Sequence, residues 1–300
     1  MMVLRWGLSL GLLAVTFAWI DPAPIVASLR QADPRWLAGA LLASVPLMLA
    51  MAWRWSFTAQ RMGIDLPLVV AWREYYASVL LNSVLPGGVA GDVVRVARQA
   101  DDPARPLGAV TRSVVVERVV GQLMLWAALV VGAAWWGFDG AMLAGLLALG
   151  AVAVVGLGLG RAASHPRLSS TWLGRGLARL RTDLRAALWG PRAVAVQLVA
   201  SAAGLGALVA MYTCSALAIG SSITVERALV VVPWILAATT LPLTVGGWGV
   251  RELSAAALFE LVSLPAADGA ASSVVFGAVS LVAALPGGVV LLWRRRGAGA

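Results

Sequence analysis

The fold is decided by an apolar stretch at residues 193–218, which reads AVAVQLVASAAGLGALVAMYTCSALA. None of its 26 side chains is charged. A helix needs about 20 predominantly apolar residues to cross the hydrocarbon core of a bilayer. The stretch is therefore long enough to span a membrane and too apolar for the surface of a soluble domain.

Similar stretches occur along the whole chain of 300 residues, of which 60% are apolar and 12% are charged. Average soluble domains carry about 25% charged residues, so this composition excludes a soluble globule. We predict an all-α, polytopic integral membrane protein with six to eight membrane-spanning helices in a single transmembrane domain over residues 1–300. The expected full spans are residues 4–20, 36–57, 113–136, 141–160, 193–218 and 272–293, and two further stretches, 75–90 and 228–264, are interrupted by Pro and Gly.

The arginines predict the orientation of the chain in its membrane. All of its basic residues are Arg, and most of them fall in cytoplasmic segments if the N-terminus is cytoplasmic. Cytoplasmic loops of membrane proteins are rich in Lys and Arg, so we expect both termini inside. Residues 228–264 are then either a hairpin or two full crossings, and both alternatives stay open. Residues 4–20 are expected to be an uncleaved first helix, with a signal peptide as the alternative.

The charge and the rare residues exclude several kinds of function. The net charge of +9 could indicate nucleic acid binding, but in a membrane protein arginines set the topology and contact lipid headgroups. The single cysteine, Cys214, and the single histidine, His165, cannot form a disulfide or a metal cluster by themselves. We therefore expect anionic lipids as partners, no nucleic acid, no cofactor and no metal ion. The chain also has no glycine-rich phosphate loop of the ATPase kind.

The longest polar segment, residues 161–192, carries a helical pattern of leucines. They recur every three or four residues, with arginines between them: Leu173, Leu177, Leu180, Leu184 and Leu188, with Arg175, Arg179 and Arg185. This pattern predicts an amphipathic helix on the cytoplasmic leaflet, where anionic lipids attract it. The alternative is an ordinary basic loop that anchors the topology.

Two short motifs form an internal repeat. The first is LPGGVAGDVVR at residues 85–95, and the second is LPLTVGGWGVR at residues 241–251. Both begin with Leu-Pro, have Gly five positions after the proline and end with Val-Arg at the same distance. Pro and Gly break helices, and unpaired backbone in a membrane must face protein or a watery cavity. We therefore predict two broken, re-entrant segments in pseudo-repeat halves, about 1–136 and 141–296, shaped by Pro86, Gly88, Gly91, Pro242, Gly246, Gly247 and Gly249.

Polar and charged residues gather beside these breaks. The candidate substrate-binding residues are Asn82, Asp92, Arg95, Glu117, Arg118, Arg251 and Glu252. Charges near membrane spans are costly unless they pair or face a cavity, and the Arg fork suits phosphate. A helix N-terminus after each break would add backbone donors for an anion. The alternative is that the arginines only snorkel or pair with their acidic neighbours.

The same motifs resemble a known family. Residues 82–88, NSVLPGG, followed by GDVVR at 91–95, resemble the first signature of the lysylphosphatidylglycerol synthase transmembrane family, often described as flippase-like. Residues 116–119, VERV, resemble its Glu-Arg element. Residues 241–252 resemble its C-terminal signature, and Pro286-Gly287-Gly288 resembles its closing Pro-Gly-Gly. The resemblance implies a lipid-handling protein of a bacterial or archaeal cytoplasmic membrane. In the synthases a cytosolic aminoacyl-transfer domain follows, and we expect it to be absent here.

These observations predict binding and flipping of an anionic phospholipid or a lipid-linked intermediate. One alternative is a membrane transferase acting on a lipid-linked donor, for which Asp92 and the pair Asp101-Asp102 are the candidate acids or bases. Another is an accessory subunit without catalytic activity, whose partner is a separate lipid-modifying enzyme. We expect the chain itself to act as a transporter, not as an enzyme.

Overall fold

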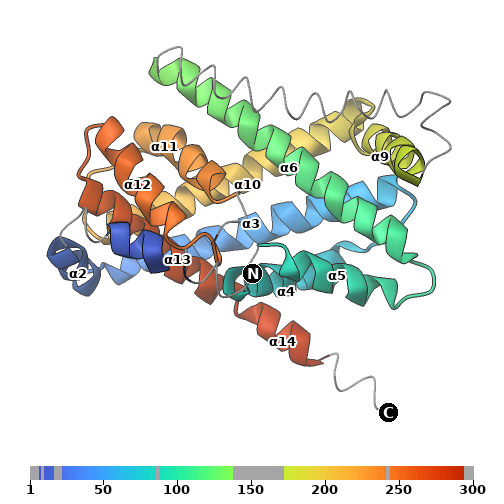
Figure 1. The fold of residues 1–300 in the computed structure, drawn as a ribbon, viewed down its shortest axis with the longest axis horizontal. Coiled ribbons are helices and arrows are strands. Elements are labelled where there is room, and N and C mark those ends of the chain that lie inside the picture. The colour runs from blue at the N-terminus through green and yellow to red at the C-terminus, as the bar shows by residue number, and fades with distance from the viewer. Residues whose placement is uncertain are drawn as a thin grey trace. The chain divides into compact units, whose positions relative to one another are not determined.

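The computed structural model describes residues 7, 10–16, 22–85, 88–137, 172–240 and 244–293. These residues form helices joined by turns, and no β-strand occurs among them, which confirms the all-α prediction (Figure 1). The helices are α2 (Pro22–Arg30), α3 (Pro34–Arg61), α4 (Leu68–Val84), α5 (Ala90–Ala100), α6 (Leu107–Trp136), α9 (Trp172–Leu188), α10 (Pro191–Ala218), α11 (Val225–Ala238), α12 (Val250–Leu261), α13 (Ala266–Ala284) and α14 (Pro286–Trp293).

Four helical segments within the described residues are long and apolar enough to cross a membrane. They are α3, α6, α10 and the run Ala266–Leu292, which joins α13 and α14. The predicted spans 36–57, 113–136, 193–218 and 272–293 are thereby confirmed as long apolar helices. Span 141–160 lies outside the described residues, and only part of span 4–20 is described. The count of six to eight crossings therefore stays a prediction.

The helix breaks at both repeated motifs. Helix α4 ends at Val84 and α5 begins at Ala90, and α11 ends at Ala238 before α12 begins at Val250. With 14 and 12 residues, α11 and α12 are about 20 Å long each, short of the roughly 30 Å of a bilayer core. The two helices pack against each other, and α12 also packs against α13. Re-entry of these segments into a membrane stays a prediction.

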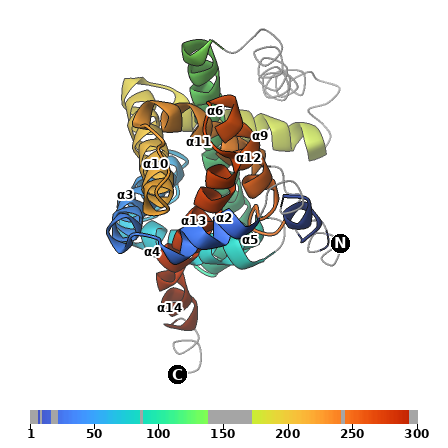
Figure 2. The ribbon, with the colours of Figure 1, turned by 90° about the vertical axis from the view of Figure 1, so that its left-hand side faces the viewer.

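The described chain divides into two compact units. Unit 1 comprises Met1–Met51, Trp72–Arg95 and Ala203–Ala300, and unit 2 comprises Ala52–Ala71 and Val96–Ala202. Within unit 1, α2 lies across α13 (Figure 2), and the start of α3 meets the end of α10, where the Asp33 amide donates to the Ala218 carbonyl at 2.8 Å. Within unit 2, α9 packs on α6, and Gln197 of α10 donates to the Thr58 hydroxyl of α3 at 3.0 Å.

Helix α4 is approached closely by other segments of unit 1. Three glycines, one from each Pro-Gly motif of the chain, approach its backbone. A methyl group added to Gly91 would overlap the Ser78 carbonyl, and one added to Gly287 would overlap the Tyr76 carbonyl. A methyl group on Gly246 would lie 2.6 Å from the Ser83 carbonyl oxygen. Small residues permit this close approach of backbones in membrane proteins, where dispersion contacts hold helices together.

We predict that Gly91→Ala and Gly287→Ala each destabilise the protein, by about 1–3 kcal/mol, because the added methyl group forces α4 away from its neighbour. Thermal unfolding of the purified protein in detergent, followed by tryptophan fluorescence, measures this effect.

The matched control is Gly206→Ala, because Gly206 lies in α10 with nothing within 4 Å of the added methyl group. An open helical glycine gains up to about 1 kcal/mol on replacement by Ala. Unfolding of all three variants at the wild-type temperature would contradict the close packing of α4.

Candidate functional site

The first break is a tight hairpin between α4 and α5. The Asn82 side-chain oxygen accepts a hydrogen bond from the Gly91 amide at 2.7 Å. Gly91 itself lies against the Ser78 carbonyl with no room for a side chain. The N-terminal amide donor of α5 at Gly91 is thus satisfied by the protein itself. Asn82 and Gly91 therefore fix the hairpin, while Pro86 lies outside the described residues and Gly88 is exposed with a φ of 64°.

A buried ion pair follows this hairpin in the first turns of α5. Arg95 binds Asp92 at 3.0 Å, and the Ser78 hydroxyl donates to the same Asp92 oxygen at 3.1 Å. The Arg95 guanidinium also lies over the ring of Tyr75, 5.2 Å from its centroid. Arg95 is 1% exposed. The structure thus brings Asn82, Asp92 and Arg95 together.

The second break is built from glycines in a conformation that other residues rarely adopt. Gly246, Gly247 and Gly249 have φ values of 57°, 80° and 89°. Positive φ costs little for Gly and more for any residue with a side chain, which explains why the motif needs three glycines. The Gly249 amide donates to a Glu252 carboxylate oxygen at 2.6 Å and so caps α12. Pro242 lies outside the described residues.

Arg251 and Glu252 form the second buried ion pair. Two nitrogens of the Arg251 guanidinium lie 2.9 and 3.2 Å from one Glu252 oxygen. Ser273 of α13 joins both, because it accepts from Arg251 at 3.0 Å and donates to Glu252 at 2.9 Å. The guanidinium lies 4.8 Å from the Trp248 ring centroid and 5.6 Å from that of Phe276. A cation in this position is held by a carboxylate, a hydroxyl and two aromatic faces.

The two breaks meet within unit 1. Gly246 of the second break approaches the carbonyl of Ser83, the residue that follows Asn82. Both ion pairs therefore belong to one compact unit, and each occupies the beginning of the helix that follows its break. The internal repeat in the sequence predicts two similar segments, and the structure shows that these segments are in contact.

Glu117 and Arg118 belong to unit 2 and point to different surroundings. Glu117 is fully buried and pairs with Arg54 of α3 at 2.5 Å, and Arg54 also donates to the Ser201 hydroxyl of α10 at 3.2 Å. Gly121 leaves space for this guanidinium, since a methyl group there would lie 2.7 Å from an Arg54 nitrogen. Arg118 is exposed. The buried charge that pairs with Glu117 is that of Arg54, 63 positions away in the sequence.

Several buried residues near these motifs escape the sequence analysis. Arg54 lies inside a predicted span, where any ionisable residue is a functional candidate, and this signal could have found it. Glu74 of α4 is buried as well. Ser273 and Tyr75 carry no signal of their own, because their roles depend on which helices pack together. Asp102 accepts from the Ala104 amide at 2.9 Å and lies near Arg105, an arrangement typical of a loop.

We predict that Glu117→Ala destabilises the protein by about 3–5 kcal/mol, because it leaves the Arg54 charge buried and uncompensated. The double variant Arg54→Met/Glu117→Leu removes both charges and should recover most of that loss. Thermal unfolding in detergent compares the variants. Equal stability of Glu117→Ala and the wild type would show that the pair does not hold α3 and α6 together.

A comparison with known protein families supports the resemblance of the motifs that surround these ion pairs. The family model described as Lysylphosphatidylglycerol synthase TM region matches residues 2–288. Searches of the curated proteins and of the solved structures return no match. The family match includes both breaks, both ion pairs of unit 1 and the Arg54–Glu117 pair. The chain is therefore a multi-pass membrane protein connected by its family with membrane lipids, and it belongs to the lysylphosphatidylglycerol synthase transmembrane-region family.

Proposed function

We propose that this protein binds the headgroup of an anionic phospholipid, or of a lipid-linked intermediate, in unit 1 and moves the lipid between the leaflets of its membrane. One observation carries the proposal. Two buried arginine–carboxylate pairs, Arg95–Asp92 and Arg251–Glu252, follow two glycine-rich helix breaks that contact each other. Charged groups inside a membrane protein are costly, and they commonly mark a substrate path.

The chemistry of the pairs suits an exchangeable anion site. An arginine without a partner would be very costly to bury, so in the empty protein Asp92 and Glu252 neutralise the two guanidinium groups. A phosphate offers the same bidentate acceptor geometry as a carboxylate and carries comparable charge. In this proposal the phosphate replaces a carboxylate as the partner of Arg95 or Arg251, and the displaced carboxylate returns when the lipid leaves.

The two helix breaks are suited to line a polar path along which a lipid headgroup crosses the membrane. Backbone that leaves helical geometry inside a membrane must face protein or a polar cavity, so these segments are natural walls of a headgroup path. Discontinuous helices in corresponding positions of two repeats form the substrate sites of many transporters. The polar side chains Asn82 and Ser273 lie beside the pairs and offer further hydrogen bonds. Arg118, which is exposed, is a candidate contact for headgroups outside unit 1.

The orientation of the protein is part of the proposal. The arginine distribution supports a cytoplasmic position for both termini, in the cytoplasmic membrane of a bacterium or archaeon. In that arrangement the predicted re-entrant segments come from opposite sides of the membrane. If segments that enter from opposite sides meet inside the bilayer, the two breaks must contact each other.

We predict that the purified protein, reconstituted in liposomes, accelerates exchange of a fluorescent anionic lipid between leaflets, measured by dithionite quenching. Arg95→Ala and Arg251→Ala should each slow this exchange at least about tenfold, which corresponds to roughly 1.4 kcal/mol of lost stabilisation. Arg251→Lys should retain part of the activity, because it keeps the charge but loses the planar fork.

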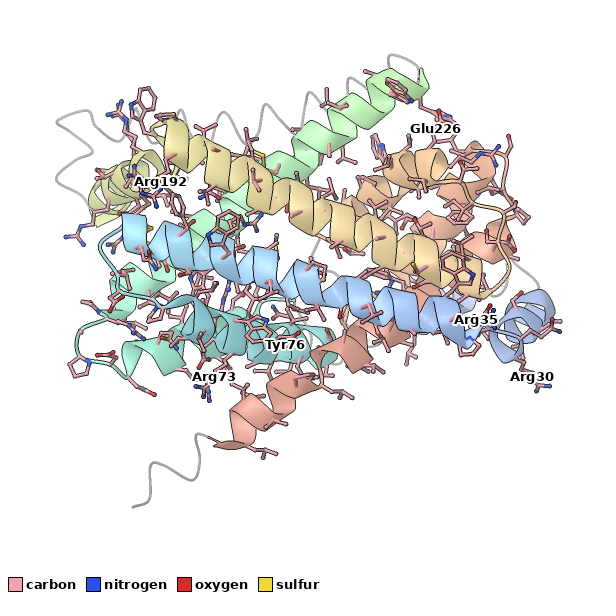
Figure 3. The ribbon with its side chains drawn as sticks, turned by 180° about the vertical axis from the view of Figure 1, so that it is seen from behind. Arg30, Arg35, Arg73, Tyr76, Arg192 and Glu226 are labelled. Atoms are coloured by element: carbon pink, nitrogen blue, oxygen red, sulfur yellow. The ribbon has the colours of Figure 1, made fainter. Side chains whose placement is uncertain are left out.

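The control variants distinguish loss of the binding site from misfolding of the protein. The variant Arg251→Met/Glu252→Gln leaves no unpaired buried charge, so it should stay folded and still fail to move the lipid. Arg35→Ala removes an exposed arginine at the start of α3 and should move the lipid normally (Figure 3). Normal exchange by a folded Arg251→Met/Glu252→Gln protein would refute this site. No exchange by the folded wild type would favour the accessory subunit or the transferase.

A further inference from the structure

Where its side chains are described, the apolar side of helix α9 packs against the protein. Leu180, Leu184, Ala187 and Leu188 pack with Met62 and with Val116, Val119 and Val120 of α6 in one apolar cluster. Leu184 and Ala187 are buried there. Three leucines of the predicted stripe, Leu180, Leu184 and Leu188, thus contact other parts of the protein.

Two arginines from neighbouring helices fix α9 in this position. Arg112 of α6 binds Asp183, the acidic residue of α9, at 2.5 Å. Arg61, in the last turn of α3, donates to the carbonyl oxygens of Ala186 and Trp189 at 2.8 and 2.9 Å. The second contact places a positive charge at the C-terminal end of the α9 dipole, where it is favourable. Asp183 is therefore engaged, and it does not neutralise the exposed side of α9.

The exposed side of α9 is basic. Arg179, Thr182, Arg185 and Trp189 are exposed and follow one another at spacings of three, three and four residues, which places them on one stripe. Trp189 is 77% exposed. Arg192, in the first turn of α10, extends the stripe and points outward beside α9 (Figure 3). We call these five residues the α9 stripe; none of them is acidic.

The α9 stripe lies where a membrane surface would be. Two candidate membrane spans end beside it, because α3 finishes at Arg61, which binds the end of α9, and α10 begins two residues after Trp189. Tryptophan is enriched at the interface between lipid and water, and the cytoplasmic leaflet attracts basic segments. From these observations we propose that the α9 stripe binds anionic lipid headgroups of the adjacent leaflet, at a surface distinct from the headgroup site of unit 1.

Charge, and not insertion of apolar side chains, holds the lipid in this arrangement. Leu180, Leu184 and Leu188 of α9 pack against α6, so the stripe can offer its guanidinium groups and one indole ring at headgroup depth. Such binding should weaken with salt, because the Debye length falls from about 10 Å at 0.1 M to about 3 Å at 1 M ionic strength. Binding through inserted leucines would show little dependence on salt.

The test uses a fluorescent probe in the middle of the stripe. The full chain carries Cys214→Ser and Thr182→Cys, is labelled at residue 182 with NBD and is reconstituted in nanodiscs. One set of discs contains phosphatidylcholine alone, and the other is rich in phosphatidylglycerol. We expect the NBD emission to shift to shorter wavelength, and quenching by neutral acrylamide to fall, in the anionic discs. Raising the salt from about 0.1 M to about 1 M should reverse both changes.

Variants identify the charges responsible. Arg179→Gln/Arg185→Gln should abolish the shift, whereas Arg179→Lys/Arg185→Lys should retain it. The matched control Arg30→Gln/Arg35→Gln removes two exposed arginines elsewhere in the chain and should leave the shift unchanged (Figure 3). Gel filtration and circular dichroism check folding, and the exposure of these side chains makes misfolding a minor risk.

Three outcomes would overturn the inference. They are identical spectra in neutral and anionic discs, a shift that survives in Arg179→Gln/Arg185→Gln, and a salt-insensitive shift with quenching by acyl-chain nitroxides, which would indicate insertion. The result does not depend on lipid transport. Loss of the shift with normal lipid exchange, or the reverse, would separate the α9 stripe from the proposed site in unit 1.

Discussion

A charge buried in a membrane protein needs a partner, and this requirement organises the described structure. Water is absent from the hydrocarbon region, so an unpaired guanidinium or carboxylate there costs several kcal/mol. Among the described residues, the pairs Arg95–Asp92, Arg251–Glu252 and Arg54–Glu117 meet this requirement. Each pair connects with a further hydroxyl or aromatic ring, so that its position depends on the helices around it. The position and chemistry of the ion pairs therefore depend on how those helices pack.

Close contact between backbones is what makes the first two pairs possible. Gly91 lets α5 approach α4 so closely that Ser78 can reach Asp92 and Tyr75 can lie under Arg95. Gly277 plays the same part for Arg251, because a methyl group there would overlap the guanidinium. Different glycines thus have different roles: Gly246, Gly247 and Gly249 form the second break, whereas Gly91 and Gly277 lie within helices and leave the space that a neighbouring backbone or charged side chain occupies.

The sequence predicts the local part of this arrangement and misses the part that depends on packing. Long apolar runs predict the four long helices, and the neighbouring positions of Arg251 and Glu252 predict their pairing. Glu117, in contrast, pairs with a residue 63 positions away, and its neighbour Arg118 is exposed. Nor does the leucine pattern of α9 tell whether lipid or α6 covers it, since both surfaces are apolar. A pattern indicates which face is buried, and only the fold identifies its partner.

The internal pairs also limit how a headgroup could bind. A phosphate that reaches Arg251 must displace a carboxylate whose oxygens accept from Arg251, Ser273 and the Gly249 amide. The exchange replaces one ion pair by a similar one and leaves the displaced carboxylate with only the Ser273 hydroxyl and the Gly249 amide, so its net gain is much smaller than the energy of either pair. A site of this kind binds weakly and releases readily. A transporter needs that balance, because a headgroup held too tightly would remain inside the protein, whereas an enzyme gains more from binding its transition state tightly.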